Sequence, residues 1–99
     1  MRIEDLEIDK EQIYKIAAKY GISKVFIFGS VARGESTAIS DIDFMIEMDR
    51  DASALGIGGF QFEVQQLLGI GIDVIPTFVF PKVDDKEFIQ TIQSEAVAL

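Results

Sequence analysis

Residues 25–37 of the chain read VFIFGSVARGEST, and this stretch decides the fold. Four residues that are all β-branched or aromatic come directly before Gly29, a composition typical of a buried strand. Gly29 and Ser30 then form either an ordinary turn or a place where the backbone comes close to a negatively charged group. We predict a strand over 24–28 and a helix that opens at Ser30.

The next strand is the clearest in the sequence and lies within residues 40–49, SDIDFMIEMD. Apolar residues recur at every second position, so successive side chains point to opposite faces of a sheet. We expect one set in the core and the other on a face that carboxylates dominate. The predicted core set is Ile42, Phe44, Ile46 and Met48, and the opposite set is Asp41, Asp43, Met45 and Glu47.

Apolar spacing and capping residues predict the remaining elements. These are a helix over 10–20 with the capping pair Asp9 and Gln12, a helix over 60–68, a strand from Ile72 to Pro76, and a last helix with the capping pair Asp84 and Glu87. The start of the helix before Phe60 stays open, because residues 50–59 are rich in glycine, which weakens a helix by about 1 kcal/mol per residue. The alternation of helices and strands predicts a single small α/β domain over residues 1–99, with a short mixed sheet flanked by helices.

The composition limits both the chemistry and the partners. The chain has no cysteine and no histidine, so disulfides, thiolate metal sites and imidazole catalysis are excluded. A metal site must therefore use oxygen ligands, which favours hard cations such as Mg²⁺. The net charge of −8 argues against direct binding to nucleic acid and favours a basic protein or a metal-masked anion. No apolar stretch approaches the about 18 residues that span a bilayer, so we expect a cytoplasmic protein without a membrane partner.

Asp41 and Asp43 are the first candidate site residues. At positions i and i+2 they lie on one side of a strand, with Cα atoms about 6.6 Å apart, and they repel each other unless a cation or solvent intervenes. An exposed acidic strand would explain an isolated pair equally well. A third acid, Asp73, interrupts the otherwise apolar stretch IGIDVIP, where an unpaired carboxylate is costly to bury. The three aspartates together predict a shared metal site.

A phosphate site is predicted upstream of these carboxylates. Gly29 permits close backbone approach, the helix start offers unpaired N–H groups, and Ser30 adds a hydroxyl donor. Arg33 carries a guanidinium suited to phosphate oxygens, and an ion pair with Glu35 or Asp41 is the alternative for it. A metal ion would bridge the phosphates and the carboxylates, as in phosphoryl-transfer sites.

Taken together, these motifs resemble a known family. Residues 28–47, FGSVARGESTAISDIDFMIE, are similar to the GSxARGxxxxxSDxDL signature of the minimal nucleotidyltransferases (MNT), a branch of the DNA-polymerase-beta-like nucleotidyltransferase superfamily. The later IDV and EAVAL also match, so the resemblance extends over most of the chain. It implies the nucleotidyltransferase fold, ATP as donor and Mg²⁺ or Mn²⁺ as cofactor.

The resemblance also implies roles for single residues. Gly29 and Ser30 match the triphosphate-binding positions, Asp41 and Asp43 the metal-binding pair, and Asp73 the residue that helps bind metal and activates the acceptor hydroxyl. One departure from the family pattern is Ile-Gly at residues 70–71, where relatives often carry a basic residue.

Many proteins of this kind are antitoxins encoded beside HEPN-domain ribonuclease toxins and are similar to enzymes that transfer AMP to a toxin tyrosine. We therefore expect a protein adenylyltransferase that acts as an antitoxin and forms an oligomer with its toxin. Two alternatives stay open: an antitoxin that neutralises a basic partner by occlusion without catalysis, and a nucleotidyltransferase acting on RNA ends or a small molecule. The acceptor residue and the number of AMP units transferred do not follow from the sequence.

Overall fold

A four-stranded mixed sheet forms the centre of the molecule, in a computed structural model that describes residues 3–35 and 41–99. The strand order is β3-β2-β1-β4; β1 is antiparallel to both β2 and β4, and β2 is parallel to β3. The strands are β1 (Ile22–Phe28), β2 (Ile42–Met48), β3 (Ile72–Pro76) and β4 (Val97–Ala98). The helices are α1 (Ile3–Ile8), α2 (Lys10–Lys19), α3 (Gly29–Ala32), α4 (Gly56–Leu68), the 3₁₀ helix η1 (Thr77–Lys82) and α5 (Lys86–Glu95).

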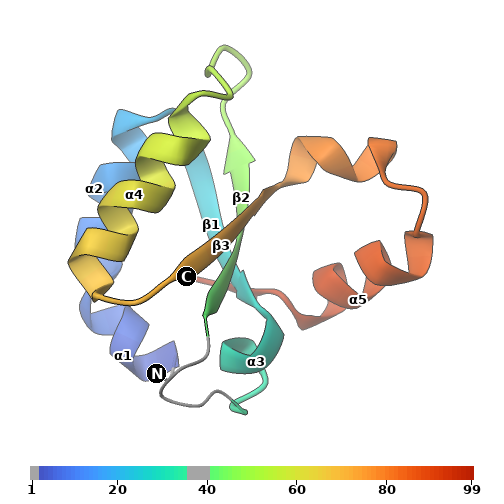
Figure 1. Cartoon of the computed structure of the whole chain (residues 1–99), viewed down its shortest axis with the longest axis horizontal. Coiled ribbons are helices and arrows are strands. Elements are labelled where there is room, and N and C mark those ends of the chain that lie inside the picture. Colours follow the sequence, from blue (N-terminus) through green and yellow to red (C-terminus); the bar gives the residue numbers. More distant parts are fainter. Residues whose placement is uncertain (1–2, 36–40) are drawn as a thin grey trace.

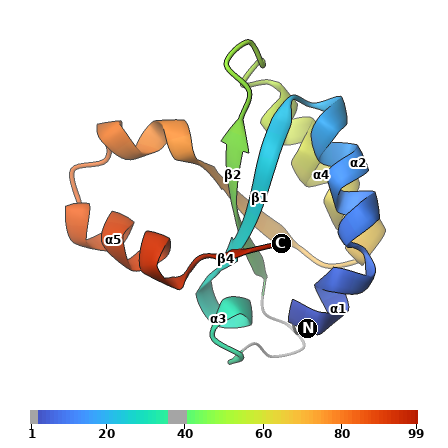
Figure 2. The same ribbon diagram turned by 180° about the vertical axis from the view of Figure 1, so that it is seen from behind.

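Helices cover the two faces of the sheet unequally. Helices α2 and α4 lie side by side on one face, with α1 at the end of α2, whereas η1 and α5 extend from the other side (Figure 1). Seen from behind, β4 lies beside β1 at the lower end of the sheet, close to α3 (Figure 2). The arrangement is the predicted α/β class, with the C-terminal strand added.

The larger apolar cluster lies between the sheet and α2 and α4. Phe44 packs its ring edge-on against Phe60 of α4, with 6.1 Å between the ring centroids. Ile42, Phe44 and Ile46 are fully buried there, as the period of two predicts, and Met48 packs against the same cluster as a half-buried residue. The predicted core face of β2 is therefore confirmed.

The opposite face of β2 differs from the prediction at one position. Met45 is buried in a second, smaller cluster with Phe28, Phe80 and Ile92, which β1, η1 and α5 contribute. Carboxylates thus dominate only the two ends of this face, around Asp43 and Glu47, because η1 and α5 cover its middle. The period of two gives the face of each side chain but says nothing of what covers it.

Helix boundaries agree with the sequence in part. Helix α2 confirms the prediction over 10–20, and Asp9 is its N-cap residue, although its side chain makes no capping hydrogen bond. The last helix is capped by Asp85 and not by Asp84: an Asp85 carboxylate oxygen accepts the hydrogen bond from the Phe88 N–H at 2.9 Å. Helix α1 and strand β4 were not predicted, since each is too short for a periodic pattern to be recognised.

Candidate functional site

Gly29 joins the first strand to the helix that follows it and packs directly on a carboxylate. It has φ +74° and is the first residue of α3, while the preceding Phe28 is paired with Asp43 across the antiparallel β1 and β2. A Cβ at this position would overlap the Asp43 carboxylate. Both the conformation and the space therefore require glycine here. Within the protein, the group that Gly29 approaches is the Asp43 carboxylate, and the approach of its backbone to a phosphate stays a prediction.

Asp43 and Asp73 face each other across the parallel pair β2 and β3, where they are direct register partners. Burial raises the pKa of Asp43, and the negative charges of Asp73 and Asp41 raise it further. The guanidinium of Arg33 acts in the opposite direction and lowers the same pKa. The negative charges of Asp73 and Asp41 thus both act on Asp43 at this edge of the sheet, and a cation bound there would relieve this repulsion.

Asp41 lies one rung further along the same face, beside a glycine. The Ile42 N–H donates a hydrogen bond to the Gly71 carbonyl at 3.2 Å, which places Asp41 next to Gly71. A Cβ on Gly71 would lie 2.8 Å from Asp41 Oδ1. The Asp41 carboxylate therefore occupies the space that a side chain at 71 would fill.

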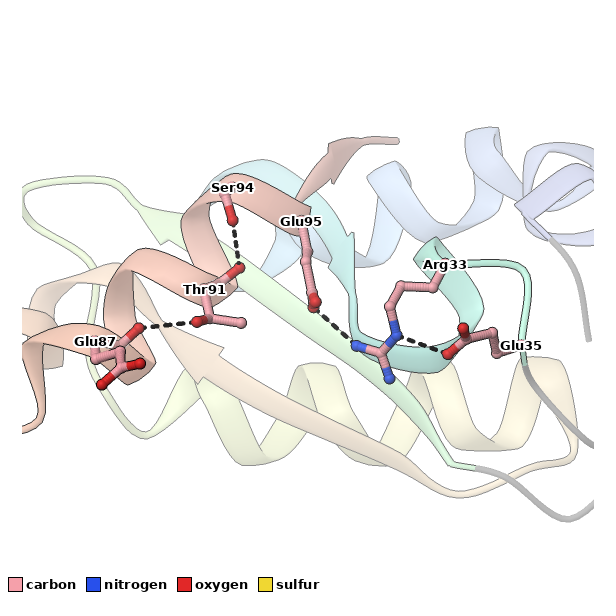
Figure 3. Close-up of polar contacts among 6 residues, drawn as sticks. All are labelled: Arg33, Glu35, Glu87, Thr91, Ser94 and Glu95. Carbon is pink, nitrogen blue, oxygen red and sulfur yellow. Dashed lines mark hydrogen bonds and ion pairs between the residues drawn. The ribbon is translucent and has the colours of Figure 1, made fainter.

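Arg33 is paired with two glutamates from different elements. Its Nε donates to Glu35 Oε2 and its Nη1 donates to Glu95 Oε2 of α5, both at 2.9 Å (Figure 3). The alternative that the sequence left open, an ion pair with Glu35, is thus observed. Ser30 is the second residue of α3 and is half-buried beside Gly29. The structure therefore brings Gly29, Ser30 and Arg33 to the same end of the sheet as the aspartates.

The three aspartates do not form a closed cage for a metal ion. Within residues 3–35 and 41–99, no group of three acidic side chains is arranged to hold one. Mg²⁺ fits such an open site, because it commonly takes one or two carboxylates and completes its shell with water and substrate phosphates. An all-oxygen donor set suits this cation. A bound cation would also relieve the repulsion between Asp43 and its two acidic neighbours. The residues present therefore fit Mg²⁺ or Mn²⁺.

Two contributors to the site were not predicted. Gly71 was noted only as a departure from the family pattern, because its place beside Asp41 depends on the register of β2 with β3, in which Ile42 pairs with Ile72. Glu95 is 62 residues from Arg33 in the sequence, and no local pattern connects them.

Comparison with known proteins identifies the family. Residues 10–99 match the family described as "Nucleotidyltransferase domain". A protein of Methanocaldococcus jannaschii named "Putative protein adenylyltransferase MJ0435" is 36% identical over 66 residues, which are 67% of this chain and 71% of that protein. "Protein adenylyltransferase MntA" of Thermococcus cleftensis is 26% identical over 61 residues, 62% of each.

Solved structures agree with this assignment. The "Structure of putative minimal nucleotidyltransferase" matches with a TM-score of 0.82 and 26% identity, over 100% of this chain and 97% of that one. A toxin–antitoxin crystal structure with AMP-PNP shares the fold, with a TM-score of 0.69 and 14% identity over 91% of this chain and 71% of that one. The chain thus belongs to the nucleotidyltransferase family, and its relatives are named protein adenylyltransferases.

Proposed function

We propose that this chain transfers AMP from ATP, in a Mg²⁺-dependent reaction, to a tyrosine hydroxyl of a HEPN ribonuclease toxin, and so acts as an antitoxin. The observation that carries the proposal is Gly29, whose missing side chain puts the start of α3 directly against Asp43. A triphosphate held by that backbone would lie next to the carboxylates that hold a cation. The names of the relatives support AMP as the transferred group and a protein as the acceptor.

Each residue at this end of the sheet has a proposed role. Asp41 and Asp43 hold the cation, which, when bound, neutralises charge on the triphosphate. Ser30 and Arg33 donate hydrogen bonds to its oxygens. Asp73, which is exposed at the edge strand β3, accepts the proton of the incoming hydroxyl. The hydroxyl oxygen then forms a bond to the α-phosphorus, the bond from that phosphorus to the bridging oxygen breaks, and pyrophosphate leaves.

The acceptor and the assembly are also part of the proposal. A protein acceptor suits the acidic chain, whose net charge of −8 favours a basic partner and disfavours RNA. We place the toxin and this chain in one oligomer, with residues 1–99 acting as a minimal nucleotidyltransferase domain.

The test uses a double variant, Asp41→Asn with Asp43→Asn. Both side chains lie on the face opposite the buried Ile42 and Phe44, so the larger apolar cluster is spared. The protein is incubated with ATP, Mg²⁺ and a HEPN ribonuclease toxin, and the toxin is weighed by mass spectrometry. We expect the wild type to add one or more AMP groups and the double variant to add none. Glu47→Gln is the matched control, because it removes a carboxylate from the exposed end of the same strand.

The outcomes separate catalysis from occlusion. AMP transfer by the double variant at the wild-type rate contradicts the assignment of the carboxylates. An unmodified toxin that the double variant still silences supports an antitoxin that works by covering a basic surface, which the net charge of −8 also suits.

A further inference from the structure

The guanidinium of Arg33 is fixed from two sides. Its five N–H donors lie in one plane, so hydrogen bonds at Nε and Nη1 together set the orientation of the whole group. Glu35, just after α3, holds Nε, and Glu95, the last residue of α5, holds Nη1. One anchor is therefore local and the other comes from the opposite end of the sequence.

The third nitrogen of Arg33, Nη2, has no hydrogen-bond partner among residues 3–35 and 41–99. In Figure 3 it points away from both glutamates. Arg33 follows the helix that begins at Gly29, and its charge acts on Asp43. The Nη2 edge of the guanidinium thus lies at the same end of the sheet as the proposed triphosphate site.

A contribution to folding stability does not explain the ion pair between Arg33 and Glu95. The side chains of Arg33 and Glu95 are 43% and 26% exposed, and ion pairs this accessible to water add little to folding. A pair of carboxylates around one arginine also cancels the positive charge that would otherwise attract a triphosphate. What the arrangement provides is a fixed direction for the remaining N–H groups.

We propose that Glu95 is a positioning residue for nucleotide binding: by holding Nη1, it orients Arg33 so that Nη2 faces the triphosphate. The proposal rests on the proposed function and deepens it, since it assigns a role to the end of α5. Helix α5 then contributes a positioning residue to the site at the start of α3, although the two helices are far apart in the sequence.

The experiment measures binding without turnover. The dissociation constant for AMP-PNP with Mg²⁺ is determined by calorimetry for the wild type, Glu95→Gln and Glu87→Gln. Glu87 lies on the same helix, is exposed, and its side chain makes no contact with Arg33, so its variant changes the net charge equally (Figure 3). We expect Glu95→Gln to weaken binding by about three- to tenfold, because the neutral amide oxygen holds Nη1 less firmly than the carboxylate does in this partly exposed pair. Glu87→Gln should leave binding unchanged or slightly tighter.

The sign of the effect is informative. Removing a negative charge from an acidic protein should by itself favour an anionic ligand, so weaker binding by Glu95→Gln cannot come from net charge. If Glu95→Gln binds as tightly as the wild type, or tightens binding as much as Glu87→Gln does, the proposal is wrong. A loss of binding that accompanies an equal loss of unfolding free energy in urea also contradicts it.

A double-mutant cycle tests whether Glu95 acts through Arg33. In an Arg33→Gln background, Glu95→Gln should have no further effect on the dissociation constant. Additive effects would show that Glu95 acts independently and would overturn the positioning role. A wild type that does not bind AMP-PNP with Mg²⁺ at all would contradict the proposed function as well, whereas equal binding by wild type and Glu95→Gln contradicts only this inference.

Discussion

At the scale of single residues, two glycines are important to this site because their missing side chains leave room for carboxylates. Gly29 leaves room for the Asp43 carboxylate, and Gly71 leaves room for that of Asp41. Each member of the D-x-D pair therefore has its own glycine, one on the helix that follows β1 and one just before β3. The first glycine could be predicted from its motif. The second could not, because its role depends on the register between two strands that are about 30 residues apart in the sequence.

Asp43 gives a prediction for stability against pH. Burial and neighbouring charges raise its pKa above the ordinary value of 3.8, so the folded protein binds this proton more tightly than the unfolded chain does. The free energy of unfolding therefore falls as the pH rises through the window between the unfolded and the folded pKa. The Asp43→Asn variant has no carboxyl group to titrate at this position, so its free energy of unfolding does not fall in this way. In EDTA, we expect the variant to gain stability relative to the wild type as the pH rises through that window, and to keep the gain at neutral pH.

Urea unfolding of both proteins across the acidic range up to neutral pH measures this difference. Glu47→Gln, at the exposed end of the same strand, corrects for the change in net charge. A stability difference between Asp43→Asn and the wild type that stays constant, or that shrinks as the pH rises, would contradict the prediction.

At the scale of elements, the sequence predicted which segments are helices and strands better than it predicted how these segments pack against one another. The sequence predicted strands at 24–28, within 40–49 and from Ile72 to Pro76, and a helix at 10–20. These predictions follow from apolar spacing and turn residues, and all four elements are observed. The glycine-rich segment before Phe60 could not be assigned, because a glycine weakens a helix in isolation. Here α4 begins at Gly56 because its first turn packs on Tyr20, at the end of α2: a Cβ on Gly56 would lie 2.9 Å from the Tyr20 carbonyl oxygen.

Gly59 and Gly58 should respond in opposite ways to the same substitution. A Cβ at Gly59 would overlap the Tyr20 ring, whose hydroxyl donates a hydrogen bond to Glu63. Gly59→Ala should therefore lower the free energy of unfolding by about 1–3 kcal/mol through overpacking. Gly58 faces open space, so Gly58→Ala should raise it by about 0.5–1 kcal/mol through helix propensity. Urea denaturation measures both; stabilisation by Gly59→Ala would show that α2 and α4 have room to separate.

At the scale of the whole molecule, the two faces of the sheet are joined by the C-terminal segment. Ile92 and Ala96 pack in the smaller cluster with Phe28, whereas Leu99 is buried in the larger one. Strand β4 carries the chain between them along β1, and the Leu99 N–H donates a hydrogen bond to the Val25 carbonyl at 3.0 Å. An apolar tail such as AVAL, residues 96–99, can either cover the core or meet a partner. Its last residue covers the core, while Val97 stays 40% exposed.

Leu99 should consequently contribute to the stability of the entire fold and not only to the end of the chain. Only 8% of it is exposed, so Leu99→Ala removes buried methyl groups and leaves a cavity in the larger apolar cluster. Such a change costs about 2–3 kcal/mol where the site cannot collapse. Val97→Ala, on the same strand but exposed, should cost less than about 1 kcal/mol. Urea unfolding followed by circular dichroism compares the two variants. If Leu99→Ala proved no more costly than Val97→Ala, the tail would be a loosely held strand, and the sheet would be stable without the contact that ties α5 and Glu95 back to the larger core.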